Sequence, residues 1–252
     1  MSDVVLECRD VGIWFTRGSR RTMLRQAVRR AFGLAVPEGD RFWALRGVDL
    51  EVREGMRLGV CGSNGSGKTT LMRVLGGVYD HDEGELVRHA GTMSLLSLGA
   101  GISHHLSGRD NVYLVGALNG LSRPEIDERY DEIAAFSELP DDVLRTPVRY
   151  YSNGMRTRLG FSIVASITPD VLFLDEIMAV GDTTFRKKSA DKLTELADRA
   201  RCVVLCSHDI GFLKRHCDRA VWLDEGRVRA AGDAVPVLNE YADFAIAARQ
   251  VS

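Results

Sequence analysis

The sequence lacks the features that mark secreted and membrane-spanning proteins. Its 252 residues contain no stretch that approaches the roughly 20 consecutive apolar residues needed to cross a bilayer. The N-terminus, MSDVVLECRD, lacks the basic and then apolar region of a secretion signal. We also find no internal repeat and no low-complexity tract. We therefore expect a cytosolic protein that folds as one large domain or as two closely joined domains.

The sequence has no large excess of either charge: 33 basic and 35 acidic residues give a formal net charge of −2. A general nucleic-acid binder needs a positive surface, so this composition argues against one. The five cysteines lie in apolar segments and predict buried, reduced thiols: Cys8, Cys61, Cys202, Cys206 and Cys217. Four residues along a strand separate Cys202 from Cys206 by about 13 Å, which argues against a shared zinc ion.

What the sequence does contain is a complete G-x-x-x-x-G-K-[ST] loop, GSNGSGKT at Gly62–Thr69, between an apolar strand at Met56–Cys61 and a helix. Its glycines let successive backbone N–H groups point inward around a triphosphate, and the helix N-terminus adds a positive partial charge. In this pattern Lys68 reaches the outer phosphates and Thr69 offers its hydroxyl to Mg²⁺. A plain glycine-rich turn is the alternative, but the strand and helix on either side favour nucleotide binding. The predicted phosphate-binding residues are Gly62, Ser63, Asn64, Gly65, Ser66, Gly67, Lys68, Thr69 and Thr70.

Two further apolar segments end in polar residues. VLFLDE at Val171–Glu176 predicts a buried strand that delivers two carboxylates to its C-terminal edge, where parallel sheets bind ligands. Asp175 would hold Mg²⁺ and Glu176 would polarise the attacking water, although a strand that ends in solvated acids is the alternative. CVVLCSHD repeats the design and places His208 at the end of a second strand, where we expect it to sense phosphate rather than to be only structural.

The hydrophobic pattern predicts strands separated by helices, and hence a mostly parallel sheet. Strands are expected at Val4–Cys8, Val48–Val52, Met56–Cys61, Glu85–Arg88, Thr92–Leu96, Val171–Leu174, Cys202–Cys206, Ala220–Leu223 and Arg227–Arg229. Helices are expected from Gly67 to Gly76, at Gly108–Asn119, at Ser122–Ser137, from Ser152 to Ile167 and near the C-terminus. Gly76 is expected to end its helix in a left-handed cap, and Ser122 to form a capping box with Glu125.

The segment Tyr151–Met155, YSNGM, places a hydroxyl and a glycine amide at a helix N-terminus, which makes a second anion site or simply a helix cap. Together with GSNGSGKT, VLFLDE and His208, it resembles the signature of the ATP-binding-cassette ATPases over nearly the whole chain. The resemblance implies an α/β fold: a P-loop NTPase (RecA-like) core with an antiparallel β subdomain and a helical signature subdomain. We expect a single domain over 1–252, with the core at about 1–96 and 166–252 and the helical subdomain at about 97–165.

In this superfamily two cassettes pack head to tail. The likeness therefore implies a homodimer in which Ser152, Asn153 and Gly154 of one protomer close over ATP and Mg²⁺ held by Lys68 of the other. Asp182, seven residues after Asp175, matches the aspartate that links the two sites, although IMAVGD replaces the more usual P-T-S-A-L-D. The catalytic residues implied are Lys68, Glu176 and His208.

Within the superfamily the chain is most similar to ATPase subunits of exporters for lipid-linked polysaccharides such as O-antigen, capsule, galactan and teichoic acid. The similarity lies in WALRGVDLEV, LLSLGAGISHHLSGRDNVYL, YSNGM and LDEIMAVGDTTFRKK. It implies two copies of a separate transmembrane permease as partners, a place on the cytoplasmic side of the cell membrane, and a lipid-linked polysaccharide as the transported substrate. A soluble cassette ATPase of translation or DNA repair and a phosphate-loop kinase are the alternatives, but paired cassettes, long heptads and a kinase lid are not visible.

Two binding roles remain open in the sequence. Most cassettes place a glutamine between the phosphate loop and the signature, but the only glutamines of this chain are Gln26 and Gln250. Ser97 stands at the corresponding position, and we expect it to hold a metal-bound water. Cassettes stack adenine on an aromatic side chain of the N-terminal strands, and Phe15 fits that position. Trp14, Phe42 and Trp43 are alternatives, and all four could instead pack a small sheet.

A basic insertion of about 17–37 lies between Phe15 and Phe42. It carries Arg17, Arg20, Arg21, Arg25, Arg29 and Arg30, and no acid occurs from Val11 to Pro37. A helical wheel separates its apolar residues from three of these arginines, which predicts an amphipathic helix. It is either a surface helix laid on the core or a helix at the membrane, where arginines would meet anionic lipid or the diphosphate of a lipid carrier.

Overall fold

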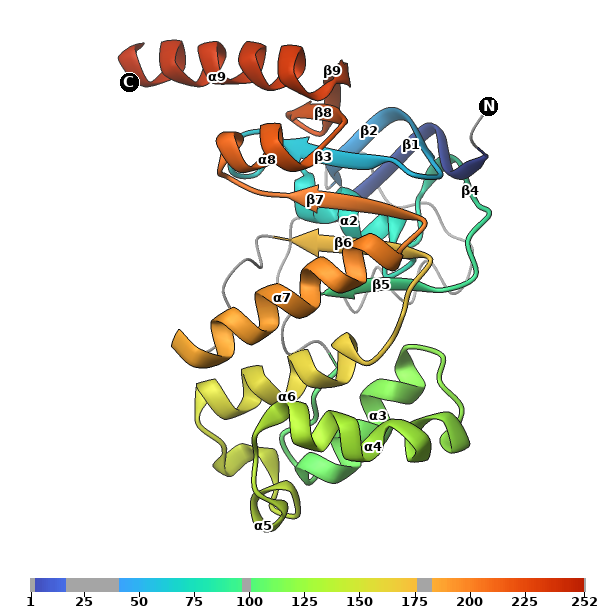
Figure 1. Ribbon diagram of the computed structural model, residues 1–252. Helices are drawn as coiled ribbons and strands as arrows, with labels where there is room; N and C mark the ends of the chain where they lie inside the picture. Colours follow the sequence, from blue (N-terminus) through green and yellow to red (C-terminus); the bar gives the residue numbers. More distant parts are fainter. Residues whose placement is uncertain (1–2, 17–40, 97–100, 176–182, 252) are drawn as a thin grey trace.

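The structure is a computed structural model, and it describes residues 3–16, 41–96, 101–175 and 183–251. Two sheets form its centre (Figure 1). The larger has the order β5-β6-β7-β3-β8-β9 and the smaller has the order β2-β1-β4. The larger sheet consists of β5 (Met93–Leu96), β6 (Val171–Asp175), β7 (Cys202–Cys206), β3 (Arg57–Cys61), β8 (Arg219–Asp224) and β9 (Arg227–Asp233). All of its pairs are parallel except β8 with β9, so the predicted mostly parallel sheet is confirmed.

The smaller sheet is antiparallel throughout and consists of β1 (Val4–Thr16), β2 (Arg41–Arg53) and β4 (Glu83–Arg88). The strands β1 and β2 are longer than the sequence pattern predicts. The register of β1 shifts between Cys8 and Val11, and Asp10 takes φ of 51°. This irregularity interrupts the alternation of apolar and polar residues, which explains why the pattern indicates only the first half of the strand.

The parallel strands β3, β6 and β7 are buried on both faces of the large sheet, as expected for parallel strands. Along β6, Val171 and Phe173 join a core formed with α2 (Lys68–Leu75) and the small sheet. Leu172 and Leu174 join the opposite core, formed with α7 (Thr183–Arg199), α8 (Ile210–His216) and α9 (Ala234–Val251). This explains why VLFLD is apolar without alternation.

The remaining helices share a third core, built around residues such as Val112, Ile133 and Leu159. They are α3 (Gly108–Leu118), α4 (Arg123–Ser137), α5 (Asp141–Leu144), the short 3₁₀ helix η2 (Val148–Tyr150) and α6 (Asn153–Ala165). We call this group the helical lobe. Figure 1 shows the helical lobe beyond the β5 edge of the large sheet, and α9 at the opposite edge.

The helix ends test the capping predictions. The capping box of Ser122 and Glu125 is confirmed. The predicted left-handed cap at Gly76 is wrong, because Gly76 has φ of −75° and the next residue, Gly77, takes φ of +74°. Two consecutive glycines stand at this helix end, and the second takes the left-handed conformation. The prediction for the basic insertion lies outside the described residues. Within the described part of the chain, no helix combines the length and the apolar character needed to cross a membrane.

Candidate functional site

The phosphate-binding loop connects β3 to α2, and two of its positions require glycine. Gly62 has φ of +146° and Gly67 has φ of +103°, a region that side chains rarely adopt. A Cβ atom at Gly67 would lie 2.6 Å from the carbonyl oxygen of Ala44, and one at Gly62 would clash with the carbonyl oxygen of Leu223. The loop is therefore closely backed by β2 and β8, and its outer residues Ser63–Gly65 are exposed.

Lys68 closes this loop from the inside. Its side chain is buried, and its Nζ donates hydrogen bonds of 2.9 Å to the carbonyl oxygens of Gly62 and Ser63. An ammonium group has three N–H donors, so one donor remains for an anion at the loop. The positive charge is thereby fixed at the N-terminus of α2, where the helix dipole adds to it.

The start of α2 offers further donors. Gly67 precedes the helix and supplies no side-chain cap, so among the described residues the amides at the very start of α2 have no intrahelical or capping acceptor. The hydroxyl of Ser66 is buried next to Gly62 and has no hydrogen-bond partner within the described residues. Such an unpaired buried group fits a loop built around an anion. Thr69 is exposed beside it, and Thr70 is half-buried.

The strand register brings the predicted carboxylate to the same edge of the sheet. In β6, Asp175 is paired with Cys206 of β7, and Cys206 is also paired with Val60 of β3. Because these strands are parallel, Asp175, the end of β7 and the start of the phosphate loop lie at one level. His208 follows β7 by two residues and is exposed there. Asp175 is half-buried.

The other polar residue after β7, Asp209, has a local role. Its side chain accepts a hydrogen bond of 2.9 Å from the backbone N–H of Phe212 and so caps α8. Three predicted residues, Glu176, Asp182 and Ser97, lie outside the described residues, so their roles remain predictions. Within the described chain, no group of three or more histidine, cysteine or acidic side chains is placed to hold a metal ion.

The YSNGM segment presents a turn to solvent at the N-terminus of α6. Ser152 caps the helix by accepting a hydrogen bond of 3.2 Å from the N–H of Met155, and Ser152, Asn153 and Gly154 are exposed. The preceding residue, Tyr151, is buried and donates a hydrogen bond of 2.7 Å to the carbonyl oxygen of Val143. Burial raises the pKa of the Tyr151 hydroxyl. The tyrosine thus anchors the turn to the helical lobe, and Figure 1 shows α6 in that lobe, on a different part of the molecule from α2.

The four aromatic candidates for adenine differ in their surroundings. Phe15 is 39% exposed and meets Tyr79 edge to face, with ring centroids 5.7 Å apart. Phe42 is 44% exposed. Arg41 lies over the ring of Trp14 at 4.6 Å, and Arg46 lies over that of Trp43 at 5.2 Å. The exposed rings of Phe15 and Phe42 are therefore better candidates than the two tryptophans.

One contact to the loop is not predicted from the sequence. The β8–β9 hairpin turns at Glu225 and Gly226, which have φ of 46° and 78°. The N–H of Gly226 donates to the carbonyl oxygen of Ser66 at 3.0 Å, and its own carbonyl accepts from Arg46 at 2.8 Å. The E-G pair between two strands signals a tight turn. Nothing local in the sequence shows that this turn supports the phosphate loop.

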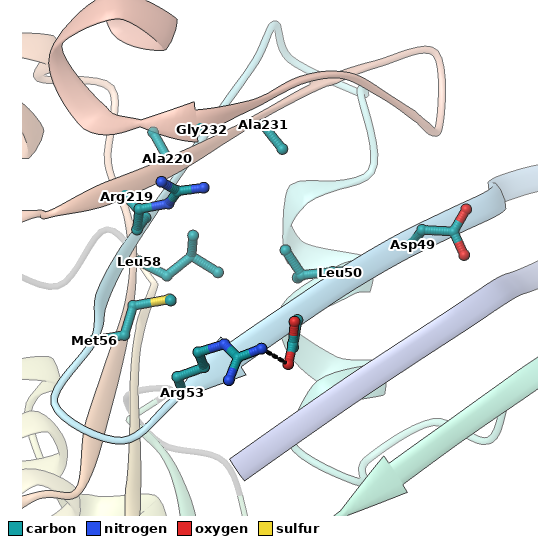
Figure 2. Close-up of a pocket in the computed structure, with 10 residues that line it drawn as sticks. Asp49, Leu50, Arg53, Met56, Leu58, Arg219, Ala220, Ala231 and Gly232 are labelled. Carbon is teal, nitrogen blue, oxygen red and sulfur yellow. Dashed lines mark ion pairs between the residues drawn. The ribbon is translucent and has the colours of Figure 1, made fainter. Parts of the chain in front are cut away.

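A hollow of about 430 Å³ lies elsewhere, between β2 and the first residues of β3 and β8 (Figure 2). Leu58 and Arg219, which line it, are paired at the N-terminal ends of their strands, the opposite edge from the phosphate loop. The two arginines that line the hollow are already paired, Arg53 with Glu51 at 2.5 Å and Arg219 with Asp233 at 2.7 Å. We do not assign the nucleotide to this hollow.

Comparison with known proteins gives a consistent result. Residues 45–179 match the ABC transporter family. The chain is 38% identical over 219 residues to the teichoic acids export ATP-binding protein TagH of Levilactobacillus brevis, a match that covers 87% of this chain and 60% of that protein. It is 42% identical over 198 residues to the O-antigen export system ATP-binding protein RfbB of Myxococcus xanthus, covering 79% of this chain and 45% of that protein. The chain thus spans about half the length of these curated relatives.

Solved structures show the same fold. A dimeric ATP-binding cassette in a post-hydrolysis state, bound to ADP and Pi, superposes with a TM-score of 0.65 at 18% identity and covers 91% of this chain and 99% of its own. An ATP-binding subunit of an ABC transporter superposes with a TM-score of 0.68 at 18% identity, and the match covers 94% of this chain and 93% of that chain. The expected fold, an α/β phosphate-loop core with an antiparallel sheet and a helical lobe, is confirmed.

Proposed function

The chain belongs to the ABC transporter family, and from this premise we propose that it is the ATP-binding and ATP-hydrolysing subunit of an exporter for a lipid-linked polysaccharide. The observation that carries the proposal is the position of Lys68. Its ammonium group is held between two carbonyl oxygens inside a glycine loop, with one N–H donor left. A triphosphate is the ligand that matches this combination of a fixed cation, helix amides and a close-packed loop.

The residues at this edge of the sheet also fit Mg²⁺. Thr69 and Asp175 provide the oxygen donors that Mg²⁺ prefers, and the ion keeps several waters in such sites. Ser97 is proposed to hold one of these waters. When bound, Mg²⁺ would neutralise phosphate charge and orient the outer phosphates.

Hydrolysis requires a base near the attacking water, and Glu176 is proposed for this role because it directly follows Asp175 at the end of β6. Its carboxylate would accept a proton from the water as the water oxygen bonds to the γ-phosphorus and the bond from that phosphorus to the β–γ bridging oxygen breaks, which releases ADP and inorganic phosphate. His208, exposed after the adjacent strand β7, is proposed to donate a hydrogen bond to the γ-phosphate. Phe15 is proposed to stack on adenine, and its exposed ring supports that role.

A homodimer would complete each site. Ser152 and Gly154 stand exposed at the N-terminus of α6, a position suited to an anion that the same protomer's loop does not hold. We propose that they close over ATP bound to Lys68 of the partner protomer, and that Asp182 links the two sites. The similarity of the fold to a dimeric cassette supports this arrangement.

Export is supported by the names of the relatives, which are teichoic acid and O-antigen export proteins at 38% and 42% identity. These names favour export over a role in translation or DNA repair. We propose that two copies of a transmembrane permease recruit the dimer to the cytoplasmic face of the membrane. Leu106 and Tyr150 are exposed on neighbouring segments of the helical lobe, joined by a hydrogen bond from Val148 to Leu106, and are proposed to meet the permease.

The proposal is tested by reconstituting the chain with its membrane subunit in liposomes that contain a lipid-linked polysaccharide. We expect ATP hydrolysis and ATP-dependent appearance of the glycan on the face of the liposome opposite the ATPase, measured with an externally added glycosidase. Hydrolysis without glycan movement would contradict export, whereas the absence of hydrolysis would contradict the ATPase assignment itself.

A further inference from the structure

Glu138, the residue that ends α4, has an unusual conformation. Its φ and ψ are 56° and 25°, in the left-handed region. Glycine and asparagine are the residues that usually end helices in this way, because a larger side chain is strained there. Glycine would therefore end α4 more easily than glutamate does.

The carboxylate of Glu138 joins two other helices. Its Oε2 accepts a hydrogen bond of 3.1 Å from Arg158 on α6, and its Oε1 accepts one of 3.1 Å from Lys188 on α7. The ammonium group of Lys188 also donates to the carbonyl oxygen of Phe136 at 3.1 Å. A single side chain at the end of α4 thus holds cations from both α6 and α7. We call this arrangement the Glu138 bridge.

Aromatic rings fix the positions of the two cations. Lys188 lies 4.5 Å from the ring centroid of Phe136, and Arg158 lies 5.3 Å from that of Phe185. These two rings and Phe161 contact one another, with centroids 5.8 to 6.0 Å apart. Phe161 and Phe185 are fully buried. The Glu138 bridge therefore lies on a rigid aromatic base where the helical lobe meets α7.

The bridge is poorly placed to be a source of stability. Glu138 and Lys188 are each 37% exposed, and ion pairs at such positions contribute little to folding. The strained backbone at Glu138 opposes even that small gain. Its geometry is more informative, because one carboxylate contacts a cation from α6 and a cation from α7.

These two helices begin at the two halves of the proposed site. The helix α6 starts at the Ser152 turn, proposed to contact the partner's ATP. The helix α7 starts at Thr183, next to Asp182 and seven residues after Glu176. A change in the angle between α6 and α7 would therefore move the signature turn relative to the residues that act on the protomer's own ATP.

We propose that Glu138 is a positioning residue that keeps α6 and α7 in the relative orientation required for hydrolysis. This inference rests on the proposed ATPase function. Glu138 itself is not proposed to contact the nucleotide. Glu138 acts through Arg158 and Lys188, so its loss should reduce turnover without weakening ATP binding to the phosphate loop.

Two variants of the full chain separate this role from folding stability. Glu138→Gly removes the bridge and also relieves the left-handed strain, so we expect its melting temperature to be equal to or above that of the wild type. Glu138→Gln keeps the size of the side chain and removes its charge. Glu128→Gln is the matched control, because Glu128 is an exposed residue of the same helix with no ion pair within the described residues.

Three quantities are measured: melting temperature, kcat and KM for ATP, and the distance between spin labels at Asp131→Cys and Asp191→Cys. The first label lies on α4, which shares a core with α6 and reports on its position, and the second lies on α7. Both positions are exposed, whereas all five native cysteines are buried. For Glu138→Gly we expect about tenfold lower kcat, an unchanged KM and a broader label distance distribution. The Glu128→Gln control should match the wild type in all three.

Two results would overturn the inference. One is wild-type turnover together with an unchanged distance distribution in both Glu138 variants. The other is a loss of activity that simply follows a loss of melting temperature. If the wild-type chain itself hydrolyses no ATP, the proposed function fails; the label distances then decide by themselves whether Glu138 sets the orientation of the helices.

Discussion

The Nζ of Lys68 donates a hydrogen bond of 2.9 Å to the carbonyl oxygen of Gly62, the first residue of the Gly62–Thr69 loop. The loop is thus closed on itself by its own lysine. Because Gly62 directly follows β3 and Lys68 begins α2, this bond also fixes the helix N-terminus relative to the C-terminal edge of the sheet. The amides at the start of α2 and the ammonium group of Lys68 are consequently held together as one unit.

The hairpin turn at Gly226 should be as important to this unit as the loop itself. A Cβ atom at Gly226 would lie 2.7 Å from the carbonyl oxygen of Ala44, in a backbone with φ of +78°. We expect Gly226→Ala to lower the free energy of unfolding by about 2 to 4 kcal/mol, through strain and overpacking, and to weaken ATP binding.

Gly55→Ala provides the control, because Gly55 has φ of +80° and nothing within 4 Å of the added Cβ. It should cost only the backbone strain, about 1 to 2 kcal/mol. Denaturant unfolding of both variants measures the difference. Equal losses would show that the close packing of the turn against Ala44 does not affect stability.

Phe15 and Phe42 can be distinguished by substitution with alanine. If Phe15 stacks on adenine, Phe15→Ala should weaken ATP binding by about 1 kcal/mol, or roughly fivefold, as for other aromatic contacts. Phe42→Ala, which removes a ring of similar exposure, should leave affinity unchanged. Fluorescence titration with ATP measures both, and the opposite ranking would assign the base to Phe42.

The buried cysteines predict a loss of stability in alkali. Burial raises the pKa of Cys61 from 9.0 to about 12, and it raises the pKa values of Cys8 and Cys217 to about 12 as well. Above pH 9 the thiols ionise in the unfolded chain but stay protonated in the fold, so the unfolded state binds fewer protons and stability falls as pH rises from 9 toward 12.

Cys217→Ala should make this fall shallower than in the wild type. Urea unfolding between about pH 8 and pH 10.5 compares the two slopes, and the slope is informative even if the substitution lowers stability at every pH. Identical slopes would show that the Cys217 thiol does not carry the effect.

Glu176→Gln tests the proposed general base. Loss of such a base typically lowers turnover about 10²- to 10⁴-fold. ATP affinity should stay near the wild-type value, because the phosphate contacts of the loop are intact. Steady-state hydrolysis and equilibrium binding are measured on the same preparation, and normal turnover in the variant would exclude Glu176 as the base.

Local patterns account for the parts of this molecule that the sequence predicts well. The phosphate loop, the apolar strand ending at Asp175 and the Ser122–Glu125 capping box each depend on residues close together in the chain. The prediction of a left-handed cap at Gly76 is wrong because either of two adjacent glycines can end the helix. Only the packed structure selects Gly77.

Contacts between distant segments explain what the sequence does not predict. The bond from Gly226 to Ser66 joins residues 160 positions apart, and nothing near either residue signals it. Glu138 reaches Lys188 across 50 positions. Such contacts depend on the way helices and sheets pack, which a single sequence does not encode as a local pattern.

The central claim is that the loop closed by Lys68 binds ATP. Calorimetric titration of the chain with ATP and Mg²⁺ tests it directly, with Lys68→Ala as the variant and Lys192→Ala, a lysine of α7 paired with Glu195, as the control. Loss of a charge-assisted hydrogen bond should weaken binding by about 1.5 to 3 kcal/mol, or roughly 10- to 150-fold, in Lys68→Ala alone. Equal affinity in all three proteins, or no binding by the wild type, would contradict the account.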